Sequence, residues 1–73
     1  MNDHVYRVIE VVGSSDKSSD DAIRNALERA SKTVRGIRWF KVIETRGHVG
    51  DGQVCHFQVT LKLGFTIEDG HDG

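Results

Sequence analysis

Two different periods of apolar residues divide the chain into its predicted elements. Residues 5–13 are rich in β-branched and aromatic side chains with no internal breaker, which predicts a first strand. Residues 14–21 are polar, with several candidate N-caps followed by two aspartates, so a helix should begin near Ser18 or Ser19. An apolar stripe of helical period follows and should end at Gly36; its members are Ala22, Ala26, Ala30, Ile23, Leu27 and Val34.

After Gly36 the apolar period changes to two, which predicts a β-hairpin. Residues 38–46 and 53–65 form its strands, joined through residues 47–52. Asp51-Gly52 predicts a two-residue type I′ turn, which fixes the register so that paired residue numbers sum to 103. This register gives one face for the helix to cover, with Phe40, Val42, Phe57, Val59, Leu61 and Leu63. The other face carries Trp39, Lys41, Ile43, Thr45, His56, Gln58, Thr60 and Lys62.

These elements predict an α+β fold of order β-α-β-β, with a three-stranded antiparallel sheet and one helix in a single domain over residues 1–73. Residues 68–73 are polar and Gly-rich, so we expect a flexible tail. One helix can cover only one face of the sheet. The face that carries Trp39 is therefore either solvated or covered by another subunit, and Trp39 and Ile43 favour a subunit.

Composition and charge narrow the class of protein. A chain of 73 residues has a thin core, and its lone cysteine, Cys55, cannot form an intrachain disulfide, so oligomerisation is the expected source of stability. Ten basic and eleven acidic residues without long blocks of one sign argue against nucleic-acid binding. No apolar run is long enough to span a membrane, and the N-terminus lacks the features of a signal peptide, so we expect a cytoplasmic protein.

Trp39 and Gln58 are the main candidates for ligand binding. Trp39, the only tryptophan, either packs at a subunit interface or stacks on a planar ligand, and both are compatible across a symmetry axis. The Gln58 amide could pair with the alternating donors and acceptors of a flavin pyrimidine edge, or it could be an ordinary polar residue on a solvated face. The predicted register puts Gln58 opposite Thr45, about 20 Å along a flat strand from Trp39 at ~3.3 Å per residue. The simplest site would therefore combine residues from different subunits.

Arg46 and His48 flank Gly47, where a guanidinium could meet a phosphate or carbonyl oxygen; a surface salt bridge is the alternative for Arg46. The four histidines are scattered and show no spacing typical of a zinc site, so we expect no transition-metal site. The serines of residues 14–19 suit helix capping better than catalysis, and no phosphate-loop motif is present. The sequence thus offers no catalytic constellation.

Several segments, in their order and spacing, resemble the bacterial members of the dodecin family over about residues 4–69. They are residues 5–15, the Ala-rich helix, Arg38-Trp39-Phe40, Thr45-Arg46-Gly47-His48 and residues 56–65. The resemblance implies a sheet partly wrapped around the helix, with twelve copies forming a hollow homododecamer. It also implies that flavins bind in pairs at twofold axes, with Trp39 stacking on the isoalloxazine and Gln58 bonding its pyrimidine edge.

Arg46 occupies a position that is basic in bacterial dodecins, which favours FMN over riboflavin. With Trp39, Gln58 and His48 it completes the candidate flavin site. Coenzyme A is a further ligand of some bacterial members. The implied function is non-enzymatic flavin storage, buffering and photoprotective quenching. The alternatives are a structural oligomer, a module that binds coenzyme A or FMN without quenching, and, as the least favoured, a small flavoenzyme.

Overall fold

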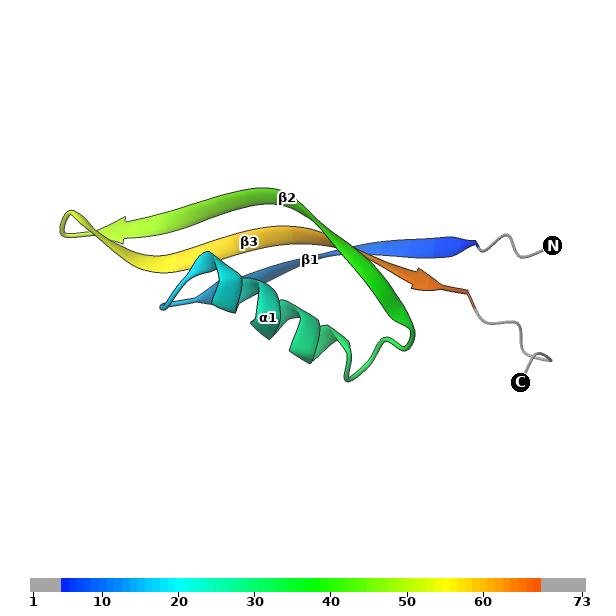
Figure 1. The fold of residues 1–73 in the computed structure, drawn as a ribbon. Helices are drawn as coiled ribbons and strands as arrows, with labels where there is room; N and C mark the ends of the chain where they lie inside the picture. Colours follow the sequence, from blue (N-terminus) through cyan, green and yellow to red (C-terminus); the bar gives the residue numbers. More distant parts are fainter. Residues whose placement is uncertain (1–4, 68–73) are drawn as a thin grey trace.

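A computed structural model describes residues 5–67, and its four elements follow the order β-α-β-β (Figure 1). They are β1 (Tyr6–Ser15), α1 (Ser19–Ala30), β2 (Ile37–Gly50) and β3 (Gln53–Thr66). β3 lies between β1 and β2 and runs antiparallel to both. The predicted α+β fold with three antiparallel strands and one helix is therefore confirmed, whereas the tail expected at residues 68–73 lies outside the described residues.

The connection from β1 to α1 is fixed by serine side chains. β1 continues two residues beyond the predicted end, because Ser14 and Ser15 still pair with β3. The hydroxyl of Ser18, the N-cap, accepts a hydrogen bond from the backbone N–H of Asp21 at 3.0 Å. The buried Ser15 hydroxyl donates to the Asp21 carboxylate at 2.7 Å. The predicted helix start is thus confirmed, and the capping serines also tie the helix to the strand.

α1 ends earlier than predicted. Its last residue is Ala30 rather than Gly36, and Val34 of the predicted apolar stripe lies beyond it. The backbone N–H groups of Lys32 and Thr33 bond to carbonyls only three residues back, at 3.2 and 3.0 Å, which tightens the chain into turns. Serine and β-branched threonine and valine are poorer helix formers than the alanines before them, which explains the early stop.

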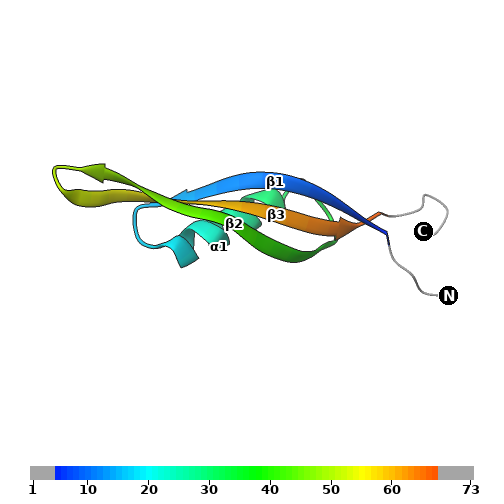
Figure 2. The same cartoon turned by 90° about the horizontal axis from the view of Figure 1, so that it is seen from above.

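The hairpin has the predicted turn but longer strands. Asp51 and Gly52 have φ angles of 53° and 75°, as a type I′ turn requires. β2 continues to Gly50 instead of ending at Arg46, so only these two residues connect the strands. The hairpin therefore projects beyond the end of β1 and beyond α1 (Figure 2).

The predicted register is correct next to the turn and between Trp39 and Val42, but it is wrong for residues 44–48, which are shifted by one position. β-bulges cause the difference. Cys55 is an extra residue on β3, Ile43 is an extra residue on β2, and the second cancels the shift made by the first. Thr45 consequently lies opposite Val59 on the helix side, and Gln58 lies opposite Arg46 instead of Thr45.

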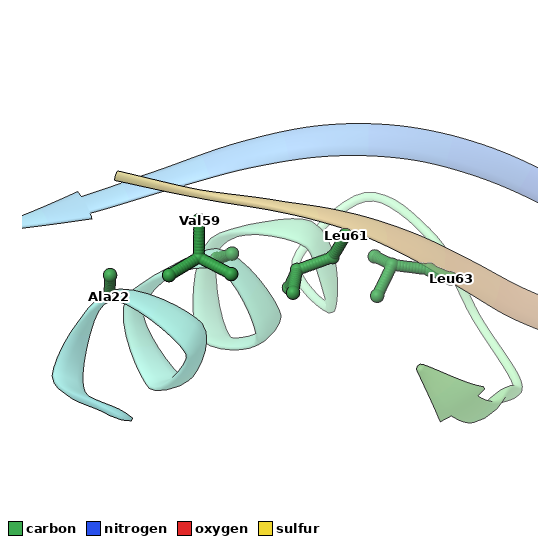
Figure 3. Close-up of a cluster of buried hydrophobic side chains, with 5 residues drawn as sticks. Ala22, Val59, Leu61 and Leu63 are labelled. Atoms are coloured by element: carbon green, nitrogen blue, oxygen red, sulfur yellow. The ribbon is translucent and has the colours of Figure 1, made fainter. Parts of the chain in front are cut away.

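The core lies between α1 and the two strands nearest to it. Five hydrophobic residues of the described part of the chain are buried: Ala22, Ala26, Val59, Leu61 and Leu63 (Figure 3). Gly13 lets the helix approach closely, because a Cβ there would lie 2.2 Å from the carbonyl oxygen of Ala22. The helix packs mainly on β1 and β3, and of β2 only Ile37 packs against the core cluster, so the expectation that the helix covers Phe40 and Val42 is wrong. These two side chains remain 45% and 39% exposed.

The chain alone is elongated. Its principal extents are 55 × 20 × 13 Å and its radius of gyration is 15.2 Å, against about 11 Å for a compact chain of this length. Many large hydrophobic side chains are exposed, among them Tyr6, Val8, Val12, Trp39 and Phe40. An elongated chain with this much exposed apolar surface fits a subunit better than a monomer.

Candidate functional site

All four predicted site residues lie on the sheet face that α1 does not cover, which we call the outer face. Residues directly opposite in an antiparallel ladder point to the same side, so the register defines this face. β2 and β3 contribute Trp39, Lys41, Glu44, Arg46, His48, His56, Gln58, Thr60, Lys62 and Gly64. β1 contributes Tyr6, Val8, Glu10, Val12 and Ser14.

Trp39 lies at one end of the outer face, where its side chain packs against a glycine of β3. Its partner across the ladder is Gly64, and a Cβ on Gly64 would lie 2.0 Å from the indole Cε2 and 2.5 Å from Nε1. The indole therefore lies directly against the β3 backbone. The Tyr6 ring meets it edge-on, with centroids 6.4 Å apart and an interplanar angle of 67°. Trp39 is nevertheless 39% exposed, so part of the indole is open to a ligand or a neighbouring subunit.

Gln58, Arg46 and Ser14 form a row of polar residues across the sheet. Gln58 lies on the central strand, opposite Arg46 on β2 and Ser14 on β1. The Arg46 guanidinium Nε lies 3.8 Å from the carboxylate Oε1 of Glu44, and both side chains are more than half exposed. An ion pair so long and so exposed holds Arg46 weakly. The guanidinium is free to exchange this partner for an anionic ligand.

Trp39 and Gln58 are not brought together within one chain. Gln58 lies six residues along β3 from Gly64, the partner of Trp39. At ~3.3 Å per residue this is about 20 Å, more than a three-ring system spans. The structure thus gathers Gln58, Arg46 and His48 near the hairpin and keeps Trp39 at the opposite end of the same face. A ligand that touches both Trp39 and Gln58 must use residues from two chains.

His48 and His56 are direct partners across the hairpin, a relation that the sequence did not predict. Their ring centroids lie 6.4 Å apart at 84°, and both side chains are exposed. The predicted register would pair His48 with Cys55, so the bulge at Cys55 is what makes the pair. The packing of the Trp39 indole against Gly64 was also not predicted from the sequence. A glycine inside a strand run was the available signal.

Residues 5–67 lack two kinds of feature. Within this range, no three histidine, cysteine or acidic side chains gather closely enough to hold a metal ion. No helix in the described part of the chain combines the length and apolar character needed to cross a bilayer.

Comparison with known proteins identifies the family. The sequence profile named Dodecin matches residues 5–68, which is most of the chain. The chain belongs to the dodecin family. The resemblance inferred from the sequence is therefore confirmed, and so is the fold expected from it.

Relatives of this dodecin share both its sequence and its fold. The dodecin of Thermus thermophilus is 45% identical over 65 residues, which are 89% of this chain and 94% of the relative. The structure of dodecin from Streptomyces coelicolor superposes with a TM-score of 0.90 at 54% identity, covering 96% of this chain and all of that one. A protein from Mycobacterium tuberculosis named calcium dodecin is 33% identical over 86% of this chain and 89% of its own length. The name of this last relative indicates that ligands differ among dodecins.

Proposed function

We propose that this dodecin binds flavin without turning it over, and that it stores, buffers and photoprotects the cofactor in the cytoplasm. One observation carries the proposal. A partly exposed tryptophan lies on a sheet face that no other element among residues 5–67 covers, and the glutamine and arginine expected to bind the same ligand lie on that face too. An outer face with these groups suits a flat, polar-edged aromatic ligand.

Each of the four residues has a distinct proposed role. The Trp39 indole stacks on the isoalloxazine, which should contribute about 1–3 kcal/mol by analogy with bases stacked on aromatic side chains. Gln58 pairs with the pyrimidine edge, since its amide offers both donors and acceptors. Arg46 and His48, on the same side of the hairpin as Gln58, favour FMN because a guanidinium and an imidazole can bind its phosphate. Coenzyme A is a second proposed ligand.

The flavin site is proposed to form between subunits. The distance along β3 between Gln58 and Gly64, the partner of Trp39, supports this arrangement. Because this distance is about 20 Å, the Trp39 and Gln58 side chains of one chain cannot both contact the same ring system. Flavins would then be held in pairs at the twofold axes of a hollow homododecamer, with each pair stacked between tryptophans of neighbouring chains. The exposed apolar residues on both faces of β2 supply surface for such contacts.

Stacking explains how a binding protein can protect a flavin. An indole in contact with the excited isoalloxazine donates an electron to it, and the return of the electron restores both ground states. No bond is made or broken, so the cycle needs no substrate and leaves no product. Two rings in close contact also shut out a substrate, which separates this function from that of a flavoenzyme.

The test follows FMN fluorescence as purified protein is added, for the wild type and Trp39→Ala. We expect the wild type to quench FMN strongly, and we expect Trp39→Ala to weaken binding by about 5- to 150-fold through loss of the stacked surface. Val49→Ala is the control, since Val49 is 72% exposed near the turn and far from Trp39. Light scattering on the same samples shows whether the variants keep the particle mass.

Three outcomes would contradict the proposal. If the assembled wild type leaves FMN fluorescence unchanged and purifies without a yellow ligand, the protein is a structural oligomer. If FMN and coenzyme A bind but emission is not quenched, the module binds without photoprotection. Bleaching of the bound flavin on addition of a substrate would favour a flavoenzyme.

A further inference from the structure

The hairpin beyond the end of β1 carries two histidines that face each other. β1 pairs with β3 only as far as Phe57, so His56 is bonded to β2 alone and lies directly opposite His48. Both imidazoles are exposed on the outer face, with ring centroids 6.4 Å apart and planes at 84°. Nothing among residues 5–67 covers the two rings, so they can change rotamer at little cost.

The bulge next to this pair adds a third group. Cys55 is the extra residue of β3, and its Sγ lies 2.7 Å from where a Cβ of Gly50 would be. Gly50 is two residues from His48 on β2, so Gly50 and His48 face the same side of the sheet. The thiol is therefore on the same side as both imidazoles. A bulge that puts consecutive residues of one strand on the same side accounts for this arrangement.

We propose that His48 and His56 form a two-histidine site for a divalent transition metal ion, Zn²⁺, Ni²⁺ or Cu²⁺. Imidazole nitrogen is a preferred ligand for these ions. Metal–nitrogen bonds of about 2.0–2.1 Å place the two ligating nitrogens roughly 3 Å apart. The rings reach this separation by rotation about χ1 and χ2, which moves the facing nitrogens of two edge-to-face rings together. Water fills the remaining coordination positions.

The charges nearby permit a cation at this position. Arg46 is the nearest like charge on the same strand and face, two residues from His48, and its charge is partly offset by Glu44 at 3.8 Å. With two protein ligands and one cation nearby, the affinity should be lower than that of a closed four-ligand site. The site shares His48 with the proposed contact to the FMN phosphate, but it does not require bound flavin and can be tested on flavin-free protein.

The experiment is isothermal titration of tag-free, flavin-free protein with ZnCl₂, NiCl₂ and CuCl₂ in separate runs. We expect about one ion per chain for at least one metal, and at least a tenfold loss of affinity in His56→Ala. His56 is outside the proposed flavin site, so this variant should still quench FMN. His4→Ala is the matched control, because it removes one histidine from outside the pair and should leave the affinity within about threefold.

A second variant separates the imidazoles from the thiol. Cys55→Ser should also leave the affinity within about threefold, because the proposed ligands are the two histidines. If no ion binds the wild type below about 1 mM, the proposal is wrong. It is equally wrong if His56→Ala binds as tightly as the wild type, or if Cys55→Ser loses the ion while His56→Ala keeps it. Circular dichroism of each variant will test whether the fold is retained, which distinguishes a loss of metal binding from a loss of structure.

Discussion

At the scale of single residues, the position of the Trp39 indole on the outer face depends on the absence of a side chain at Gly64. The Trp39 indole occupies the space where a Cβ of Gly64 would lie, and the Tyr6 ring meets the indole edge-on. The orientation of the only tryptophan is thus set by a missing side chain on one neighbouring strand and an aromatic ring from another. A strand glycine usually weakens a sheet, and here the close approach of an indole explains its place.

The change Gly64→Ala should displace the indole, because its new Cβ would lie 2.0–2.5 Å from three indole atoms. We expect altered near-UV circular dichroism and a shifted tryptophan emission maximum, with a stability loss of about 1–3 kcal/mol from overpacking. Trp39 is the only tryptophan, so the emission reports on this site alone. Gly47→Ala is the control, since its nearest contact would be 3.3 Å and far from Trp39. Unchanged spectra for Gly64→Ala would contradict the account.

At the scale of elements, the start of α1 and its attachment to β1 rest on the same small group of side chains. Ser18 caps the helix, while the buried Ser15 hydroxyl donates to Asp21 and accepts from the Lys17 backbone N–H at 2.9 Å. Asn25 adds a bond from its amide to the Ser14 carbonyl at 3.0 Å. These bonds fix the direction in which the helix leaves the strand, and the alanine stripe can then reach the core.

Replacing Ser18 by alanine removes the hydroxyl that accepts the Asp21 N–H, so the first turn of α1 should fray. We expect a loss of about 0.5–2 kcal/mol in the free energy of unfolding, measured by urea denaturation at fixed protein concentration. Ser18→Asp keeps a cap acceptor and should retain most of the stability. Equal losses in the alanine and aspartate variants would show that the cap is not the cause.

At the scale of the whole molecule, the described residues leave a large apolar surface exposed, so we expect the single chain to be only marginally stable. Within residues 5–67 the core contains five buried hydrophobic residues, while Phe40 and Val42 on β2 lie on the helix side but remain partly exposed. Tyr6, Val8 and Val12 are exposed on the other face. We expect burial of these side chains between chains to supply the stability that the thin core does not.

Phe40→Asp tests the role of this surface, because it puts a charge where we expect a subunit contact. The wild type should elute near twelve times 8.2 kDa, or about 98 kDa, in size exclusion with light scattering. Phe40→Asp should elute as monomer or small oligomers and should unfold at lower denaturant concentration. Lys32→Asp introduces the same side chain at an exposed position just after α1 and should keep the large particle. A Phe40→Asp variant of full mass would exclude Phe40 from the contact.

Much of the fold follows from local sequence signals. Apolar periods distinguish strands from helix, serines and aspartates set the helix start near Ser18, and Asp51-Gly52 specifies the hairpin turn. The helix end was less predictable, because residues 31–36 have weak preferences and the turns after Ala30 are made by backbone bonds. Trp39 was correctly expected on the face opposite the helix, since the register holds at Trp39 and Gly64.

The sequence by itself therefore determined the order and kind of the elements, the turn, and the resemblance to the dodecin family, because these depend on neighbours in the chain. Tertiary structure alone decided that α1 covers two strands of three, that Gln58 faces Arg46, and that His48 faces His56. Alternation of period two continues on each side of a bulge, but its phase reverses in the bulged strand, so that Lys41 and Glu44 share the outer face. The sequence does not show where this reversal occurs, and so it does not reveal the one-residue shift in pairing. That shift is fixed only when both strands and the helix pack together, since only then does one pairing bury Val59, Leu61 and Leu63 against Ala22 and Ala26.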